Sequence, residues 1–501
     1  MLLVPLLTQA HADTKASLET FKQGVSRVLA PTPTAVNTID LSGLSNVQVD
    51  TSRVQELPTV AAPVSKTNAS GGTSVNNTTS NRNSVTLSPT QKRQIGFTQA
   101  IQEAVQRRPE ITQSLSQLSA QGANIDVAKA KYYPQISGGL GTADLTKGER
   151  GRQVINLEAT QMLYDFGKTK STVDIEKAKF DQEQARVLVS IDDVAFQVAS
   201  TIVNIRRYQD IVRIANEQIT GVAKIAEIAN LRATAGISSQ ADPIQAQSNL
   251  EAAQSNKIVQ ETQLRQYLQK LRTLLGYDVS NVDWVIPDSV VKRAALYDEP
   301  EFNQIPEMLV AQTGVEIAKY QKQQSKLTYY PTLSVKGNLS QAINGRNPNN
   351  NKDDGFYNSI MLEASSSLYQ GGAVGAQTRS ASYAEEAAKA QVNATYLEVW
   401  DQVRLLREEI ENKQRQMQVL QSKKQTSIRT KELYQEQYKL GTRTVVDLLN
   451  AEQAIHSASQ EIESARYDIY SALVQYIQVT GRSRDLYDLN NISIQGFDIQ
   501  P

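Results

Sequence analysis

Two long runs of helical periodicity, about residues 168–231 and 373–440, contain no proline. At about 1.5 Å per residue, each run would extend roughly 100 Å as one helix, which is more than a globular domain requires. In the first run, apolar side chains recur at steps of three and four residues and form a seam of the coiled-coil type. The seam comprises Ile191, Val194, Val198, Ile202, Ile205, Tyr208, Val212, Ala215, Ile219, Val222, Ala226 and Ala229. Because this seam must be covered along its whole length, the chain is expected to form an assembly of long helices lying side by side.

The two helical runs belong to halves of the chain that repeat one pattern. A Tyr-Tyr-Pro motif ending at Pro134 recurs about 200 residues later, ending at Pro331. A glycine turn that follows the first run, at Gly236, recurs after the second run at Gly441 and Thr442. Glycine ends a helix readily because it adopts the left-handed conformation without steric penalty. After each turn the helical pattern resumes, so each half is expected to carry a helical hairpin with a tight turn at its tip.

Before each long run, the apolar side chains alternate with polar ones, which is the period of a β-strand. In the first half, Ile155, Leu157 and Ala159 alternate with polar residues, and the second half repeats this register about 200 positions later. Partner strands are expected at about residues 135–145 and 332–342. Each half therefore holds a hairpin of strands of roughly 9 to 11 residues, which is the length that crosses a bilayer.

Four membrane strands cannot close a barrel by themselves. An open edge in lipid would leave backbone groups without hydrogen-bond partners, so closure has to come from several chains. Two chains would give eight strands, whose interior is filled by side chains, whereas three give twelve strands and room for a lumen. The expected fold is an α+β membrane protein with a duplicated helix–β-hairpin–helix plan. A trimer then forms a twelve-stranded β-barrel continuous with a long α-helical tunnel.

The composition excludes several kinds of site. Lys and Arg together number 52, as do Asp and Glu, so no overall basic charge points to nucleic acid. The chain has no cysteine and only two histidines, which excludes disulfides, thiolate metal sites and a histidine cluster. Glu158 and Glu363 lie in expected strands without a paired acid or base, and no phosphate-binding glycine loop is present. We therefore expect no catalytic, cofactor or metal site, and we expect His456 on a helix surface.

Shifts in composition suggest the domain boundaries. Residues 1–12 look like the end of a secretory signal, with cleavage expected after Ala12, although the basic first part of such a signal is missing. Residues 13–90 lack sustained periodicity and are expected to form a low-complexity linker in the periplasm. The first repeat is assigned to residues 91–288, the second repeat to 289–491, and a C-terminal tail to 492–501.

The most specific motif lies at the second tip and reads Gly-Thr-Arg-Thr-Val-Val-Asp-Leu-Leu-Asn-Ala from Gly441 to Ala451. Together with the duplicated plan, the repeated Pro-Glu pairs and the Leu-Tyr-x-x-Gly motif, it resembles the TolC family of outer-membrane channel-tunnel proteins over about residues 91–491. The resemblance implies a homotrimer whose barrel contacts outer-membrane lipid and whose helical tunnel extends into the periplasm. It also implies two partners, a periplasmic adaptor protein and an inner-membrane pump of the ABC or RND type.

The resemblance further implies roles for residues at the helical tips. The family positions that match Asp242, Tyr438 and Arg443 take part in contacts that hold the tunnel entrance shut. The positions that match Asp447 and Asn450 line the narrowest part of the entrance, where the family pattern has two acidic rings. Because this chain has an asparagine at the second position, one ring of carboxylates remains, and the cation selectivity is expected to be weaker.

Simpler roles for the tip residues remain open. Asp242 before Pro243 suits a helix start, with aspartate as the cap and proline at the first helical position. Capping explains Asp447 less well, because this residue lies inside the resumed apolar pattern. Arg443 and Tyr438 can also be plain exposed tip residues. If Arg443 pairs with Asp242, within or between subunits, such an exposed ion pair contributes about 0.2 to 1 kcal/mol and can be opened by a docking partner.

Three functions are compatible with these features. The first is an outer-membrane exit duct for a large protein in type I secretion, because residues 239–243 and 448–453 look like the branch of the family that serves adhesin-type secretion. The second is tripartite efflux of small toxic compounds, against which the missing lipidation cysteine argues. The third is a soluble coiled-coil scaffold, which accounts for the helices but not for two strand hairpins in matching register.

Overall fold

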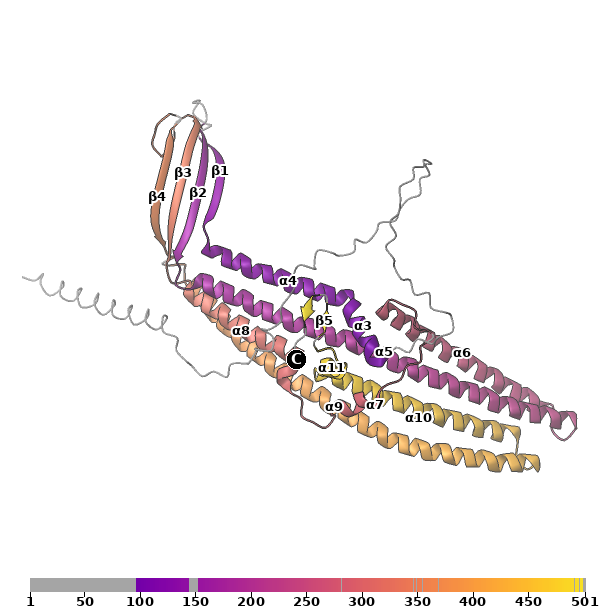
Figure 1. The fold of residues 1–501 in the computed structure, drawn as a ribbon. Helices are drawn as coiled ribbons and strands as arrows, with labels where there is room; N and C mark the ends of the chain where they lie inside the picture. The colour runs from indigo at the N-terminus through magenta and orange to yellow at the C-terminus, as the bar shows by residue number, and fades with distance from the viewer. Residues whose placement is uncertain are drawn as a thin grey trace, which may run out of the picture. The chain divides into compact units, whose positions relative to one another are not determined.

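The two long helical runs each form one continuous helix in the computed structural model (Figure 1). Helix α5 spans Lys168–Thr234 and helix α9 spans Ala373–Lys439, and each has 67 residues. Each long helix is followed by a helix of 35 residues that runs back along it, α6 (Ala241–Leu275) after α5 and α10 (Val445–Val479) after α9. The prediction of one helical hairpin in each half is confirmed.

The structure describes residues 96–498, apart from 144–151, 281, 346, 348, 354, 368, 491 and 495. The expected signal segment, residues 1–12, and the expected linker, residues 13–90, lie outside the described residues. The turn of the first strand hairpin lies outside them as well.

Shorter helices precede the strand hairpins of both halves. Helices α3 (Phe97–Arg107) and α4 (Pro109–Lys129) and the 3-10 turn η2 (Ala130–Tyr132) precede the first hairpin, and α8 (Pro306–Leu327) precedes the second. Both α4 and α8 begin with proline, whose missing N–H costs nothing at the first position of a helix.

Several small elements lie between the halves or near the C-terminus, and the sequence pattern did not predict them. They are α7 (Asp288–Arg293), η3 (Phe302–Gln304), α11 (Ser483–Leu486), β5 (Ser493–Ile494) and β6 (Phe497–Asp498). The strands β5 and β6 pair with each other, and Ile494 and Phe497 are buried. The expected C-terminal tail, 492–501, therefore contains a small packed hairpin.

Helix α5 is the helix against which most of the others pack. It contacts α3, α4, α6, α8 and α10, and seam residues such as Ile191, Val198 and Ile202 have no exposed surface. One 18-residue window of α5, with a mean hydropathy of 1.3, is apolar enough to cross a membrane, but 61% of this window is buried inside the chain. The apolar character of α5 is therefore explained by the covering helices, as the coiled-coil pattern predicts.

The four long strands form one antiparallel sheet in the order β1-β2-β3-β4 (Figure 1). Their bounds are Gln135–Ala143 for β1, Arg152–Tyr164 for β2, Thr332–Asn344 for β3 and Phe356–Ser365 for β4. Because β2 of the first half pairs with β3 of the second half, the sheet joins the two repeats. Within the described chain, β1 and β4 each keep one edge without a partner strand.

The pairing register gives the sheet one apolar face and one polar face. Leu157 lies opposite Leu339, and the adjacent Glu158 lies opposite Asn338 on the other face. On the apolar face, Ile360 is 87% exposed in the single chain. The predicted alternation is confirmed, and a row of exposed apolar side chains on strands of this length is typical of a surface that faces lipid.

A sharp corner joins each strand hairpin to the long helix that follows it. The backbone φ angle is positive at Phe166 (58°) and Gly167 (91°) before α5, and at Gly371 (60°) and Gly372 (82°) before α9. At the first corner, Asp165 accepts hydrogen bonds from two backbone N–H groups at the start of α5, at 3.0 and 2.6 Å. These bonds satisfy donors that the first turn of a helix leaves free.

One carboxyl group is buried in α5 without a hydrogen bond. Asp192 is 4% exposed, and neither of its carboxylate oxygens has a partner among the described residues. Burial raises the pKa of Asp192 to about 7, although the positive charge of Arg484 acts in the opposite direction. A buried charge without a hydrogen-bond partner destabilises the folded state, so Asp192 makes stability depend on pH.

We expect Asp192→Asn to raise the melting temperature at pH 8 and to have little effect at pH 4. The unfolded carboxyl titrates near its ordinary pKa of about 4. Because the folded pKa is about 7, the stability that the protonated form provides is full below pH 4 and lost as the pH rises to 7. Scanning calorimetry of the detergent-solubilised protein measures this, with Asp401→Asn, at an exposed position of α9, as the control. An equal gain at pH 4 and pH 8 would contradict the assignment.

Candidate functional site

The tips of both helical hairpins have the same backbone turn. Gly236 (φ 72°) follows α5 and Gly441 (φ 76°) follows α9, both in the left-handed conformation. After α9, the N–H of Gly441 bonds to the carbonyl of Tyr438, and the N–H of Thr442 bonds to the carbonyl of Gln437, both at 3.0 Å. The turn after α5 repeats both bonds. This is the Schellman arrangement, which satisfies the free carbonyls at a helix end and requires the glycine.

Asp447 takes part in the start of helix α10. Its backbone N–H donates to the hydroxyl of Thr444, while its carboxylate accepts from the backbone N–H and the hydroxyl of Thr444, at 3.3 and 2.9 Å. The two residues form a capping box. The expectation that capping explains Asp447 poorly is therefore wrong, because α10 begins at Val445 and places this residue third in the helix.

Asp242 lies in the first turn of α6 but is not its cap. The helix begins at Ala241, whose N–H donates to the hydroxyl of Ser239 at 3.2 Å. The expectation that Asp242 caps the helix with Pro243 at its first position is wrong, because the helix starts two residues before the proline. A carboxylate in the first helical turn is still favoured by the partial positive charge of the helix N-terminus.

Tyr438 is buried at the second tip and faces groups from the first. It is 3% exposed, so the alternative of an exposed tip residue is wrong. The guanidinium of Arg232, in the last turn of α5, lies 4.8 Å from the centre of the tyrosine ring and donates to the carbonyl of Lys439 at 3.2 Å. Burial and the nearby charge of Asp242 raise the pKa of Tyr438, against the effect of Arg232. The structure thus places Tyr438 of the second half against Arg232 of the first, and the Tyr438 hydroxyl makes no hydrogen bond to Asp242 within the described chain.

Arg443 is half exposed and makes its contacts within its own hairpin. Its Nε donates to the side-chain oxygen of Gln437 at 3.0 Å, and its guanidinium lies 4.6 Å from the ring centre of Tyr434. It also forms a long ion pair with Asp447, at 3.8 Å. Among the described residues, Arg443 forms an ion pair with Asp447 and none with Asp242. An ion pair between Arg443 of one subunit and Asp242 of another stays a prediction.

An apolar cluster holds the two tips together below the polar turns. It consists of Val222, Ile225, Ala229, Ala246, Tyr438, Val445, Leu448 and Leu449. These residues come from α5, α6, α9 and α10, so all four helices are joined near the tips. By contrast, Asn450 is exposed and is not part of this cluster.

The sequence analysis missed two groups of residues near the tips. Arg232 was detectable only as a basic residue in the last turn of α5, a common position for a cation. Glu452 is 3% exposed, forms an ion pair with Lys431 of α9 and shares a hydrogen bond of 3.0 Å with Nε2 of His456. The expectation that His456 lies on a helix surface is wrong, since its side chain is 8% exposed where α10 packs between α5 and α9.

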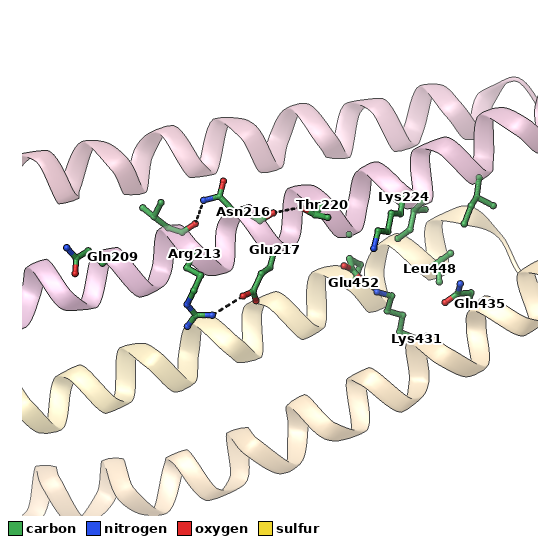
Figure 2. Close-up of a pocket in the computed structure, with 14 residues that line it drawn as sticks. Gln209, Arg213, Asn216, Glu217, Thr220, Lys224, Lys431, Gln435, Leu448 and Glu452 are labelled. Carbon is green, nitrogen blue, oxygen red and sulfur yellow. Dashed lines mark hydrogen bonds and ion pairs between the residues drawn. The ribbon is translucent and has the colours of Figure 1, made fainter. Parts of the chain in front are cut away.

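A polar groove of about 870 Å³ lies between α5 and the α9–α10 hairpin (Figure 2). On its α5 wall, Arg213 and Glu217 form an ion pair at 2.9 Å, and Lys431 and Glu452 lie on the opposite wall. Across the described residues, no group of three or more Asp, Glu or His side chains is placed to hold a metal ion. The chemistry of the tips is therefore that of ionic, aromatic and apolar contacts between helices.

A family model for outer membrane efflux proteins matches residues 100–277 and 302–482, more than half of the chain. The outer membrane protein TolC of Salmonella enteritidis is 25% identical over 424 residues, covering 78% of this chain and 84% of that protein. The alkaline protease secretion protein AprF of Pseudomonas aeruginosa is 22% identical over 353 residues, covering 64% of this chain and 73% of that protein.

Solved structures of outer membrane channels have the same fold. The outer membrane protein VceC of Vibrio cholerae superposes with a TM-score of 0.65 at 14% identity, covering 77% of this chain and 96% of that one. The CmeC outer membrane channel of Campylobacter jejuni gives a TM-score of 0.64 at 15% identity, covering 81% of this chain and 87% of that one. At these identities the likeness concerns the fold.

We expect Thr444→Ala to open the start of α10 by removing the capping box. Loss of such a cap costs about 1 kcal/mol. The backbone amides of residues 445–448 should therefore exchange hydrogen about five times faster, since 1 kcal/mol corresponds to roughly that factor. Thr430→Ala is the control, because the Thr430 hydroxyl donates to a backbone carbonyl within α9. Equal exchange in both variants would show that the cap does not hold this turn.

Proposed function

The chain belongs to the outer membrane efflux protein family, and we propose that it is the exit duct through which an export system releases its substrate. It is an outer membrane protein, as the TolC and VceC relatives are. Its role is that of a channel and not of an enzyme. Family membership sets aside the alternative of a soluble coiled-coil scaffold.

The observation that carries this proposal is the four-stranded sheet with an apolar face and two open edges. Its strands have the length that crosses a bilayer, and the exposed apolar residues include Leu140, Ile360 and Leu362. Three copies of the sheet close into a twelve-stranded barrel with a lumen. The long helices of the three chains then continue the lumen as a periplasmic tunnel.

We place the gate of the duct at the helical tips. The burial of Tyr438 against Arg232 supports this assignment, because it couples the tip of one helical hairpin to the tip of the other. Arg443 and Asp447 keep part of their side chains exposed, and Asn450 is exposed, so these residues are available to a neighbouring subunit or to the lumen. A ring of three Asp447 carboxylates would give weak cation selectivity.

The exported substrate is proposed to be a large protein, released by type I secretion. The likeness to AprF, an alkaline protease secretion protein, supports this choice. The likeness to BepC of Brucella suis, an outer membrane efflux protein, supports the alternative, tripartite efflux of small toxic compounds. In either case the partners are a periplasmic adaptor and an inner-membrane ABC or RND pump, which would engage the periplasmic tips.

We expect Arg443→Ala to raise the conductance of the protein several-fold in planar lipid bilayers. The substitution removes the ion pair with Asp447, the stacking on Tyr434 and any contact with a neighbouring subunit. Arg213→Ala is the matched control, because it removes an exposed ion pair on α5 away from the turns. If both variants conduct like the wild type, Arg443 is not part of a gate.

Deletion of the gene is expected to abolish the release of a surface adhesin or secreted protein while drug tolerance stays unchanged. Comparison of the secreted proteins and of the minimal inhibitory concentrations, with and without a plasmid-borne copy, measures this. Loss of drug tolerance with normal secretion would instead assign the duct to small-molecule efflux.

A further inference from the structure

Gly221 lies in the C-terminal part of α5, where the side chain of Glu452 on α10 packs against the backbone of α5. A Cβ atom at Gly221 would overlap the carboxylate of Glu452 on α10. Glycine is costly inside a helix, by about 1 kcal/mol relative to alanine. Among the other helical glycines described, Gly122 and Gly314 would place a Cβ at ordinary contact distances of 3.5 and 3.6 Å. Because Gly221 has no side chain, the carboxylate of Glu452 can occupy the space beside the α5 backbone.

Glu452 is a buried carboxylate whose charge is balanced inside the α9–α10 hairpin. Its partners are Lys431 on α9 and Nε2 of His456, one turn further along α10. Burial opposes ionisation, but the hydrogen bonds from His456 and Lys431 outweigh it, so the pKa of Glu452 is lowered. Lys224 of α5 lines the same groove, but among the described residues the ion pair of Glu452 is formed with Lys431 of α9.

Further along the same helices, α10 is joined to α5 in a different way. Asp468 of α10 pairs with Arg207 of α5 at 2.6 Å and with Lys413 of α9 at 2.8 Å. In addition, the hydroxyl of Tyr467 donates to Asp210 of α5 at 2.6 Å. At this level, separation of α10 from α5 would break an ion pair and a charged hydrogen bond. At the level of Gly221 it would break a packing contact and the uncharged hydrogen bond between Gln218 of α5 and Gln453 of α10.

The Gly221 contact lies directly beside the apolar cluster of the tips. Leu448 precedes Glu452 by one helical turn, and Figure 2 shows Leu448, Glu452 and Lys431 together along the groove. Next to it, Gln218 of α5 donates to the side-chain oxygen of Gln453 at 2.5 Å. A shift of Glu452 away from α5 therefore moves the start of α10, where Asp447 lies.

We propose that Glu452, seated on the bare backbone of Gly221, is a positioning residue that holds the α9–α10 hairpin against α5 in the closed duct. This inference rests on the proposed gate at the tips. Because the ion pairs of Glu452 lie within the hairpin, the hairpin can leave α5 without exposing an unpaired charge in the protein interior. The contact between Glu452 and Gly221, called here the Gly221 seat, then separates first. The ion pair between Arg207 and Asp468 keeps α5 and α10 joined further along the helices.

The test is single-channel conductance of the full-length protein in planar bilayers. Gly221→Ala is expected to raise the conductance several-fold, because the added methyl group displaces the Glu452 carboxylate from the Gly221 backbone and removes this contact between α10 and α5. Gly314→Ala, in α8, is the matched control and is expected to conduct like the wild type. The double variant Gly221→Ala with Glu452→Ala is expected to conduct no more than Gly221→Ala alone, because both substitutions remove the same contact.

The outcomes separate this inference from the proposed gate. If Arg443→Ala raises the conductance and Gly221→Ala does not, the seat is overturned and the gate stands. If neither does, both are overturned. If Gly221→Ala does not assemble in the outer membrane, the variants Glu452→Ala and Glu452→Gln test the seat instead. Glu452→Ala should conduct more than the wild type. Glu452→Gln keeps a side chain of the same shape at Gly221 and should conduct like the wild type. Equal conductance of the two variants and the wild type would overturn the seat.

Discussion

Backbone hydrogen bonding in hydrocarbon is the constraint on which the rest of this structure depends. The sheet β1–β4 exposes apolar side chains on one face, and its outer strands keep open edges within the described chain. In lipid, each unpaired N–H or C=O group costs several kcal/mol, so such a sheet cannot remain open there. Strands from other copies of the chain satisfy the edges at no such cost. The open edges of the sheet therefore require other copies of the chain, which the proposed trimer supplies. The long helices have to pack within the same trimer.

The long helices meet this requirement through two kinds of contact. Apolar seams cover α5 and give most of the burial, which stabilises the bundle without fixing how one helix slides along another. Partly buried charges shared between helices, such as Asp468 with Arg207 and Lys413, are paired only in one register of the helices. Near the tips, the contact between α10 and α5 loses this ionic component at Gly221. Near the proposed gate, α10 and α5 are therefore joined by apolar packing and an uncharged hydrogen bond in place of the ion pair.

Much of the fold could be predicted because its signals are local. The duplicated motifs, the helical period and the strand alternation gave the two long helices, the return helices and the sheet register to within a few residues. The small elements α7, α11 and β5–β6 could not be predicted, because short segments carry too few periods to identify. At the tips, the sequence pattern indicated the glycine turns and the candidate gate residues beside them. It did not indicate that Asp447 belongs to a capping box, since that depends on where α10 begins.

The sequence by itself determined which segments are helix and strand, where the turns lie, and that the chain is a duplication. These properties follow from backbone preferences and from the period of apolar residues, which act between neighbours in the chain. Only the tertiary structure decided which side chains are buried and paired. Side chains with polar groups usually lie on the solvated face of a helix. In this fold three of them, Tyr438, Glu452 and His456, are buried because helices distant in sequence lie against them. Whether a charged group is buried or paired depends on residues distant in the sequence. These contacts determine how the helices of the candidate gate are held together.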